Sequence, residues 1–265
     1  MRKSDLAARL AAAFVGVALA LAALAASPAE VAAVGRVVTV LVGIVVTAAA
    51  ARAFAHDDPP RRPWSIRAAA LVLLLAARLV DPLQAALLPG PRVRLAHVLI
   101  IVANALGAAA MVGFAAVIRA SGLGTRERGA GDLALGAAAL VAALVAARTL
   151  AGIQGPLLDT SDLASWVRAL ALTASTLADA IVFIVAAGLV RVLAPMRDGV
   201  VAWPYLLLAI DGACFLVLDL ASTSEYPALV GLTEVVSVIG ASAGIVAALA
   251  QIAIVRASAP ASAPA

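Results

Sequence analysis

The chain has 265 residues, of which 65% are hydrophobic and 13% are charged, and its mean hydropathy is +1.10. Soluble globular domains are about 45–50% apolar and about 25% charged, so this composition excludes that class and indicates an integral membrane protein. The single cysteine excludes an intrachain disulfide and a multi-cysteine metal site. The net charge of +4 is explained by membrane topology rather than by nucleic acid, so the expected partner is the lipid bilayer.

The chain contains a series of apolar stretches that could each cross a bilayer, which takes about 20 residues of helix. They are residues 6–26, 31–52, 66–88, 95–118, 132–151, 168–190, 201–220 and 228–255. Short polar, Pro-rich or Gly-rich segments join them, as turns require. The sequence therefore predicts an all-α, polytopic transmembrane bundle of about eight helices, with a disordered tail at 257–265.

The distribution of basic residues predicts the orientation of these helices. Of the 19 basic residues, most fall at the ends that would share a side with both termini. Those on the other side are Arg36, Arg92, Arg94 and Arg168, while Arg78 and Arg148 lie inside apolar stretches. The positive-inside rule then places both termini in the cytoplasm. We expect a multi-pass protein of a prokaryotic inner membrane.

The first apolar stretch has a second interpretation as a secretory signal, because Ala23-Leu24-Ala25 resembles a cleavage site. Cleavage there would leave seven helices. The stretch is about 20 residues long, whereas the apolar region of a signal is usually about 7–15 residues. A retained helix is therefore favoured.

Residues of uncommon types recur in the two halves at nearly constant separation, which indicates an internal duplication. The matched pairs include Arg52 with Arg191, Trp64 with Trp203, Asp81 with Asp219, Pro89 with Pro227, His97 with Glu234, and Gly107 with Gly244. Chance matching in Ala- and Val-rich sequence is the alternative. The duplication predicts two parallel four-helix repeats, residues 1–128 and 129–256, and places the extra residues of the second in a loop around 155–162.

Polar residues inside the apolar stretches are the candidates for function, because ionisable groups in lipid face a bundle interior or a water-filled cavity. The candidate site residues are Arg78, Asp81, His97, Asn104, Arg148, Asp179, Asp211, Asp219 and Glu234. Acids outnumber arginines in this set. A buried carboxylate that lacks a counter-charge takes up a proton or binds a cation, which favours proton or cation chemistry. The alternative is structural, with Arg78–Asp81 and Arg148–Asp179 as ion pairs that fix helix register.

The motifs leave three classes of function. Walker loops, dinucleotide-binding glycine motifs, His-Glu-x-x-His and nucleophile elbows do not occur, so we expect no cofactor. No lysine lies in any apolar stretch, which excludes a retinal pigment bound as a Schiff base. The His56-Asp57-Asp58 segment is interpreted as a solvated turn.

The first hypothesis is a small proton- or cation-coupled transporter, with a polar cavity between residues 66–88 and 201–220 that opens alternately to each side. The second is a non-catalytic sensor or assembly subunit, which predicts a tightly packed bundle without a cavity. The third is a lipid-modifying enzyme, which predicts that Asp219, Glu234 or His97 faces one pocket. Small residues on several faces also permit a homo-oligomer or a membrane protein partner.

Overall fold

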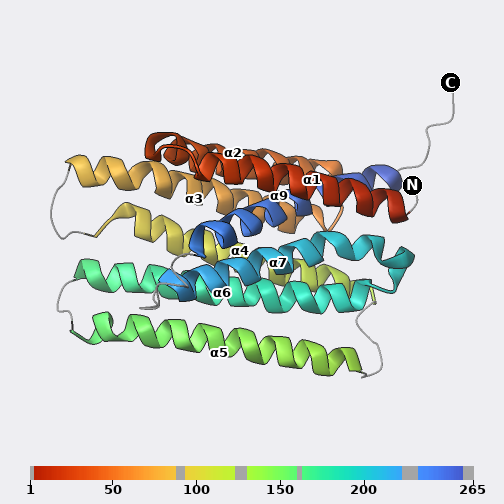
Figure 1. The fold of residues 1–265 in the computed structure, drawn as a ribbon. Helices are drawn as coiled ribbons and strands as arrows, with labels where there is room; N and C mark the ends of the chain where they lie inside the picture. The colour runs from red at the N-terminus through yellow and green to blue at the C-terminus, as the bar shows by residue number, and fades with distance from the viewer. Residues whose placement is uncertain (1–2, 88–92, 123–129, 160–162, 223–231, 259–265) are drawn as a thin grey trace.

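The computed structural model describes residues 3–87, 93–122, 130–159, 163–222 and 232–258, and the elements within these ranges are all helical (Figure 1). The helices are α1 (Lys3–Ala25), α2 (Ala29–Ala53), α3 (Arg61–Leu87), α4 (Leu95–Ala120), α5 (Ala130–Asp159), α6 (Leu163–Leu193), α7 (Trp203–Ser222) and α9 (Thr233–Ser258). A short 3₁₀ helix, η1 (Met196–Ala202), joins α6 to α7.

The lengths and composition of the helices confirm a membrane-spanning bundle. Within the described ranges, seven helices are long and apolar enough to cross a bilayer, and α5 contributes a shorter apolar stretch at Leu135–Ala151. Many large apolar side chains lie on the outside of the bundle, including Leu19, Val45 and Leu140, each more than 60% exposed. Lipid tails are the environment that such a surface fits.

The structure corrects the expectation of a loop around 155–162. Helix α5 continues to Asp159, so most of that segment is helical. The apolar stretch in the sequence ends earlier because hydropathy marks the part of a helix that must lie in lipid, and not the residue at which helical hydrogen bonding stops.

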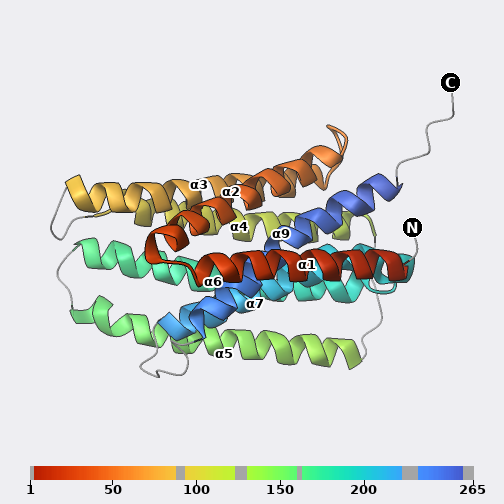
Figure 2. The ribbon, with the colours of Figure 1, turned by 45° about the horizontal axis from the view of Figure 1, so that its top comes forward.

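All the long helices run roughly along one axis, and α1 begins at the same end of the bundle at which α9 ends (Figures 1 and 2). We call this the terminal end, and the other the opposite end. Helix α2 packs against α3 and α9, and α6 packs against α7 and α4, while α3–α4 and α7–α9 form the two closest pairs. Helix α5 lies at one edge, against α6 and α7 (Figure 2).

The apolar core gathers at the terminal end. Trp64 near the start of α3 packs edge-on against Phe114 of α4, with ring centroids 5.1 Å apart. Phe114 in turn packs edge-on against Tyr205 near the start of α7, at 5.6 Å. Leu6 and Leu10 of α1, Leu193 of α6 and Ile254 of α9 belong to the same buried cluster. This core closes the terminal end of the bundle.

Candidate functional site

A cavity of about 530 Å³ lies inside the bundle, between this core and the opposite end. Its walls come from α2, α3, α4, α6, α7 and α9, with a contribution from the end of α1. Binding pockets for small molecules are typically about 300–1,000 Å³. The cavity therefore has the size of a small-solute site.

Most of the residues selected from the sequence line this one cavity. They are Arg78, Asp81, His97, Asn104, Asp179, Asp211, Asp219 and Glu234. They come from five helices, α3, α4, α6, α7 and α9. The exception is Arg148, which lies on α5 with its side chain exposed and does not line the cavity.

The floor of the cavity is an ion pair between the two halves of the chain. Arg67 of α3 donates a hydrogen bond from Nη2 to Oδ2 of Asp211 on α7, at 2.6 Å. Both side chains are only 11% exposed. A Cβ atom on Gly244 of α9 would lie 3.2 Å from Asp211 Oδ1, so the absence of a side chain there leaves room for the carboxylate.

A second group of carboxylates lies above this pair. Asp179 of α6 is within electrostatic reach of Asp211, Asp219 and Arg67. Asp219 Oδ2 is 2.9 Å from Oγ1 of Thr176, which is fully buried on α6. Arg67 thus acts on Asp211 and Asp179, while Asp219 is held by hydroxyl hydrogen bonds from α6.

The hydroxyl of Thr176 can serve Asp219 in either protonation state. Its Oγ1 also lies 3.1 Å from the carbonyl oxygen of Leu172. A hydroxyl has one proton to donate and lone pairs with which to accept. It can donate to an ionised Asp219, or donate to Leu172 and accept a hydrogen bond from a protonated Asp219.

The structure does not contain the two ion pairs that the structural alternative named, Arg78–Asp81 and Arg148–Asp179. Asp81 accepts a hydrogen bond from Arg94 Nη1 at 2.9 Å, and forms no ion pair with Arg78. The chain reverses after α3, which brings the start of α4 back over Asp81 and Gln84. Gln84 Oε1 accepts a 2.9 Å hydrogen bond from the backbone N–H of Leu95 in the same region. Arg148 and Asp179 likewise form no ion pair.

Two further arginines line the cavity without a partner among the described residues. Arg36 of α2 and Arg78 of α3 are exposed rather than buried, and they are close enough for their like charges to act on each other. Within the same ranges, the Nδ1 atom of His97 is buried and makes no hydrogen bond. Donor groups are therefore available to a ligand in the cavity.

Arg36 and Arg67 are site residues that the sequence reasoning missed. Both lie near the ends of apolar stretches, 31–52 and 66–88. Arg67 lies well inside α3, which begins at Arg61. An arginine stem is long enough to carry its charge inward from such a position, but the sequence does not say in which direction it points.

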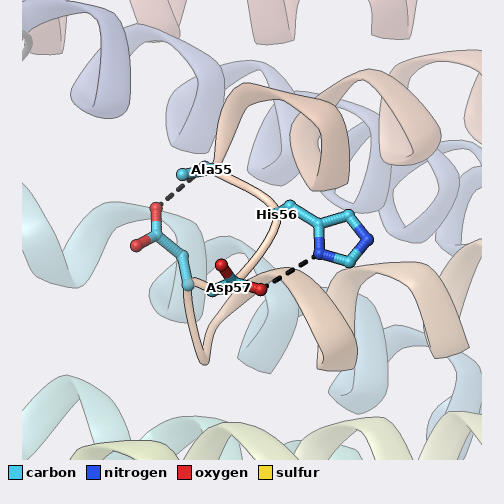
Figure 3. Close-up of polar contacts among 4 residues, drawn as sticks. Ala55, His56 and Asp57 are labelled. Atoms are coloured by element: carbon cyan, nitrogen blue, oxygen red, sulfur yellow. Dashed lines mark hydrogen bonds and ion pairs between the residues drawn. The ribbon is translucent and has the colours of Figure 1, made fainter.

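The His56-Asp57-Asp58 segment is a surface turn between α2 and α3 (Figure 3). His56 Nδ1 lies 3.1 Å from Asp57 Oδ1, and both side chains are almost fully exposed. Asp58 accepts a 2.8 Å hydrogen bond from the backbone N–H of Ala55, which closes the turn. In the described part of the chain, no group of three or more His, Cys, Asp or Glu side chains is arranged to hold a metal ion.

Comparisons with known proteins indicate no function, so the functional argument rests on the cavity. No protein-family model, no curated protein and no solved structure matches this chain.

Proposed function

We propose that the protein is a small membrane transporter that carries a polar solute, coupled to protons or cations through the carboxylates of α6 and α7. The observation that carries this proposal is the polar cavity at Arg67, Asp211 and Asp219, enclosed by helices from both halves of the chain. Charged groups in a membrane interior are costly, and those that occur usually line a substrate or ion pathway or pair with one another.

The bundle is packed at one end and hollow towards the other, which supports an alternating-access mechanism. Trp64, Phe114 and Tyr205 close the terminal end, while the cavity occupies the other part of the bundle. A transporter exposes its site to one side at a time by rocking one half against the other. In this proposal the structure represents one such state, and the closed end lies in the cytoplasm, as the positive-inside pattern of the sequence predicts.

The proposed duplication gains support from the positions of matched residues. Asp81 and Asp219 line the same cavity, as do His97 and Glu234, and Gly107 and Gly244. The packing is also paired, because α2 contacts α9 while α4 contacts α6. Binding sites of transporters built from repeats lie at the repeat interface, which is where this cavity lies under the proposed division at residue 128.

The proposed proton coupling uses the carboxylates of α6 and α7. Asp211 is paired with Arg67, so the proposal places the exchangeable proton on Asp179 or Asp219. Thr176 accommodates both protonation states of Asp219 by the hydrogen bonding described above. Neutralising Asp219 should therefore abolish coupled flux while leaving the fold intact.

The other two hypotheses agree with the structure to different degrees. A tightly packed module without a cavity does not describe the portion of the chain that the structure covers. A lipid-modifying enzyme remains the second candidate, because His97, Asp219 and Glu234 do line one cavity. Incubation of the purified protein with phospholipid vesicles, followed by chromatography of the lipids, separates the enzyme from the transporter.

The test is flux in proteoliposomes. Purified protein is reconstituted, and internal pH and monovalent cation entry are followed under imposed gradients for the wild type, Asp219→Asn and Asp81→Asn. Arg148→Gln is the matched control, since this arginine lies outside the cavity. We expect flux in the wild type and the control, and none in Asp219→Asn. Equal flux in all variants, or none under any gradient, would contradict the proposal.

A further inference from the structure

The ionisable residues that line the cavity divide by charge between the two halves of the chain. Those from residues 1–128 include all three arginines, Arg36, Arg67 and Arg78. Those from residues 129–256 are all acids: Asp179, Asp211, Asp219 and Glu234. Asp81 is the one acid that the first half contributes, and Arg94 already pairs with it. One wall of the cavity is therefore basic and the other acidic.

The basic wall has charge available for a ligand. Arg67 is held by Asp211, whereas Arg36 and Arg78 have no carboxylate partner among the described residues and are accessible. Their like charges act on each other, so an anionic group between them would relieve repulsion. Two guanidinium groups also offer the planar donor pairs that suit a carboxylate or a phosphate.

The acidic wall lies on α6, α7 and α9. Asp179 and Asp219 lie within electrostatic reach of each other, and Glu234 stands at the start of α9 with its side chain exposed. Arg67 pairs directly with Asp211 and also acts on Asp179. A cationic group of a ligand near Asp179 and Asp219 would add attraction on this wall. A cavity with opposed charges on low-dielectric walls orients a dipolar ligand.

We propose that the ligand of this cavity is a small zwitterion. Its carboxylate or phosphate is bound by Arg36 and Arg78, and its ammonium group lies against Asp219 and Asp179. The cavity volume of about 530 Å³ admits such a solute with water around it. The inference rests on the proposed function for the role of the cavity, but it concerns binding and not flux.

This ligand chemistry has two sources. A free amino acid or amino phosphate carries it, and so does the headgroup of phosphatidylethanolamine entering from the bilayer. The shared element is an ammonium group a few bonds from an acidic group. The experiment has an arm for each source.

The soluble arm measures the melting temperature of the purified full-length protein with matched probes. The first series is 4-aminobutyrate, butyrate and butylamine, and the second is phosphoethanolamine, ethyl phosphate and ethylamine. In each series one analogue lacks the ammonium group and the other lacks the acidic group. The lipid arm compares nanodiscs of phosphatidylglycerol with and without phosphatidylethanolamine.

We expect the zwitterion in at least one arm to raise the melting temperature more than either single-charge analogue. Arg78→Gln and Arg36→Gln should each weaken binding by about tenfold or more, since each removes charge-assisted hydrogen bonds. Arg148→Gln should leave binding unchanged. The inference is overturned if no zwitterion exceeds its analogues, or if the effect survives the loss of both Arg36 and Arg78.

The ligand-free protein gives a second readout that does not depend on the choice of probe. Arginines kept for a ligand repel each other when the cavity is empty, so Arg36→Gln should leave the unliganded protein equally stable or more stable. A lower melting temperature in both single variants would instead make these arginines structural and overturn the inference. Binding without flux would contradict the transport proposal alone, and flux of a simple cation without zwitterion binding would contradict this inference alone.

Discussion

Arg67 and Asp211 meet at 2.6 Å between α3 and α7, and this contact joins the two halves of the chain at the floor of the cavity. Both side chains are largely buried, and the apolar core begins immediately beyond them. The pair links α3 to α7 across the interior of the bundle. It also separates the part of the bundle that is packed from the part that is open.

Breaking this pair from one side should destabilise the fold. Asp211→Leu removes the carboxylate that hydrogen-bonds the buried Arg67, which costs about 3–5 kcal/mol. The double variant Arg67→Met/Asp211→Leu should recover most of that loss, because it removes both buried charges. Unfolding in mixed detergent micelles measures the three free energies. A double variant no more stable than the single one would contradict this account of the pair.

The ion pair between Arg94 and Asp81 should contribute much less. Arg94 and Asp81 are 41% and 44% exposed, and exposed ion pairs contribute about 0–1 kcal/mol. Arg94→Gln should therefore change the unfolding free energy by less than about 1 kcal/mol. The same unfolding experiment, repeated at high salt, should show little further change. A loss as large as that for Asp211→Leu would contradict this account and would mean that the Arg94–Asp81 pair is buried.

The close packing of α6 against α7 depends on Gly212. A Cβ atom there would lie 2.8 Å from the backbone nitrogen of Phe183 and 3.0 Å from the carbonyl oxygen of Asp179. Backbone atoms cannot give way as a flexible side chain can, so Gly212→Ala should destabilise by about 1–3 kcal/mol.

Gly107→Ala is the matched control for this substitution. Nothing lies within 4 Å of a Cβ atom at Gly107, which faces the cavity. The same change should be neutral or stabilising there, because alanine favours a helix by up to about 1 kcal/mol over glycine. Melting temperatures of the two variants compare them directly, and similar losses for both would contradict the packing argument.

The hydroxyl of Thr176 should matter for coupled flux and not for folding alone. Thr176→Val keeps the shape of the side chain but removes the group that can bond Asp219 in both protonation states. We expect proton-coupled flux in liposomes to fall severalfold. Thr149→Val is the control, since Thr149 is equally buried and bonds only a backbone carbonyl, that of Val145, on α5. Equal flux losses in both variants would assign the effect to helix packing.

The sequence could predict which residues lie in the interior, because exposing a polar group to lipid is costly. Polar groups in apolar stretches must turn away from lipid, so Asp81, Asn104, Asp179 and Asp219 were expected inside and do line one cavity. Arg148 obeys no such constraint. It lies on α5 at the edge of the bundle, and a long side chain can reach a polar region without entering the interior.

Partners could not be predicted in the same way, because they depend on how helices distant in the sequence are placed. Local spacing suggested Arg78 for Asp81, yet the reversal between α3 and α4 brings Arg94 there instead. Asp211 pairs with Arg67, which is far away along the chain. The position of the packed core at the terminal end could not be predicted from the sequence either, since Trp64, Phe114 and Tyr205 come from three different helices.

The central claim is that the cavity opens alternately to each side of the membrane, and the access of reagents to Asn104 tests it most directly. Cys214 is first replaced by alanine, and Asn104→Cys is introduced into the reconstituted protein. A membrane-impermeant maleimide is then applied from each side, with and without a pH gradient. The account predicts labelling from the opposite end at rest, and additional labelling from the terminal end when the gradient drives turnover. Labelling from one side under every condition would contradict it.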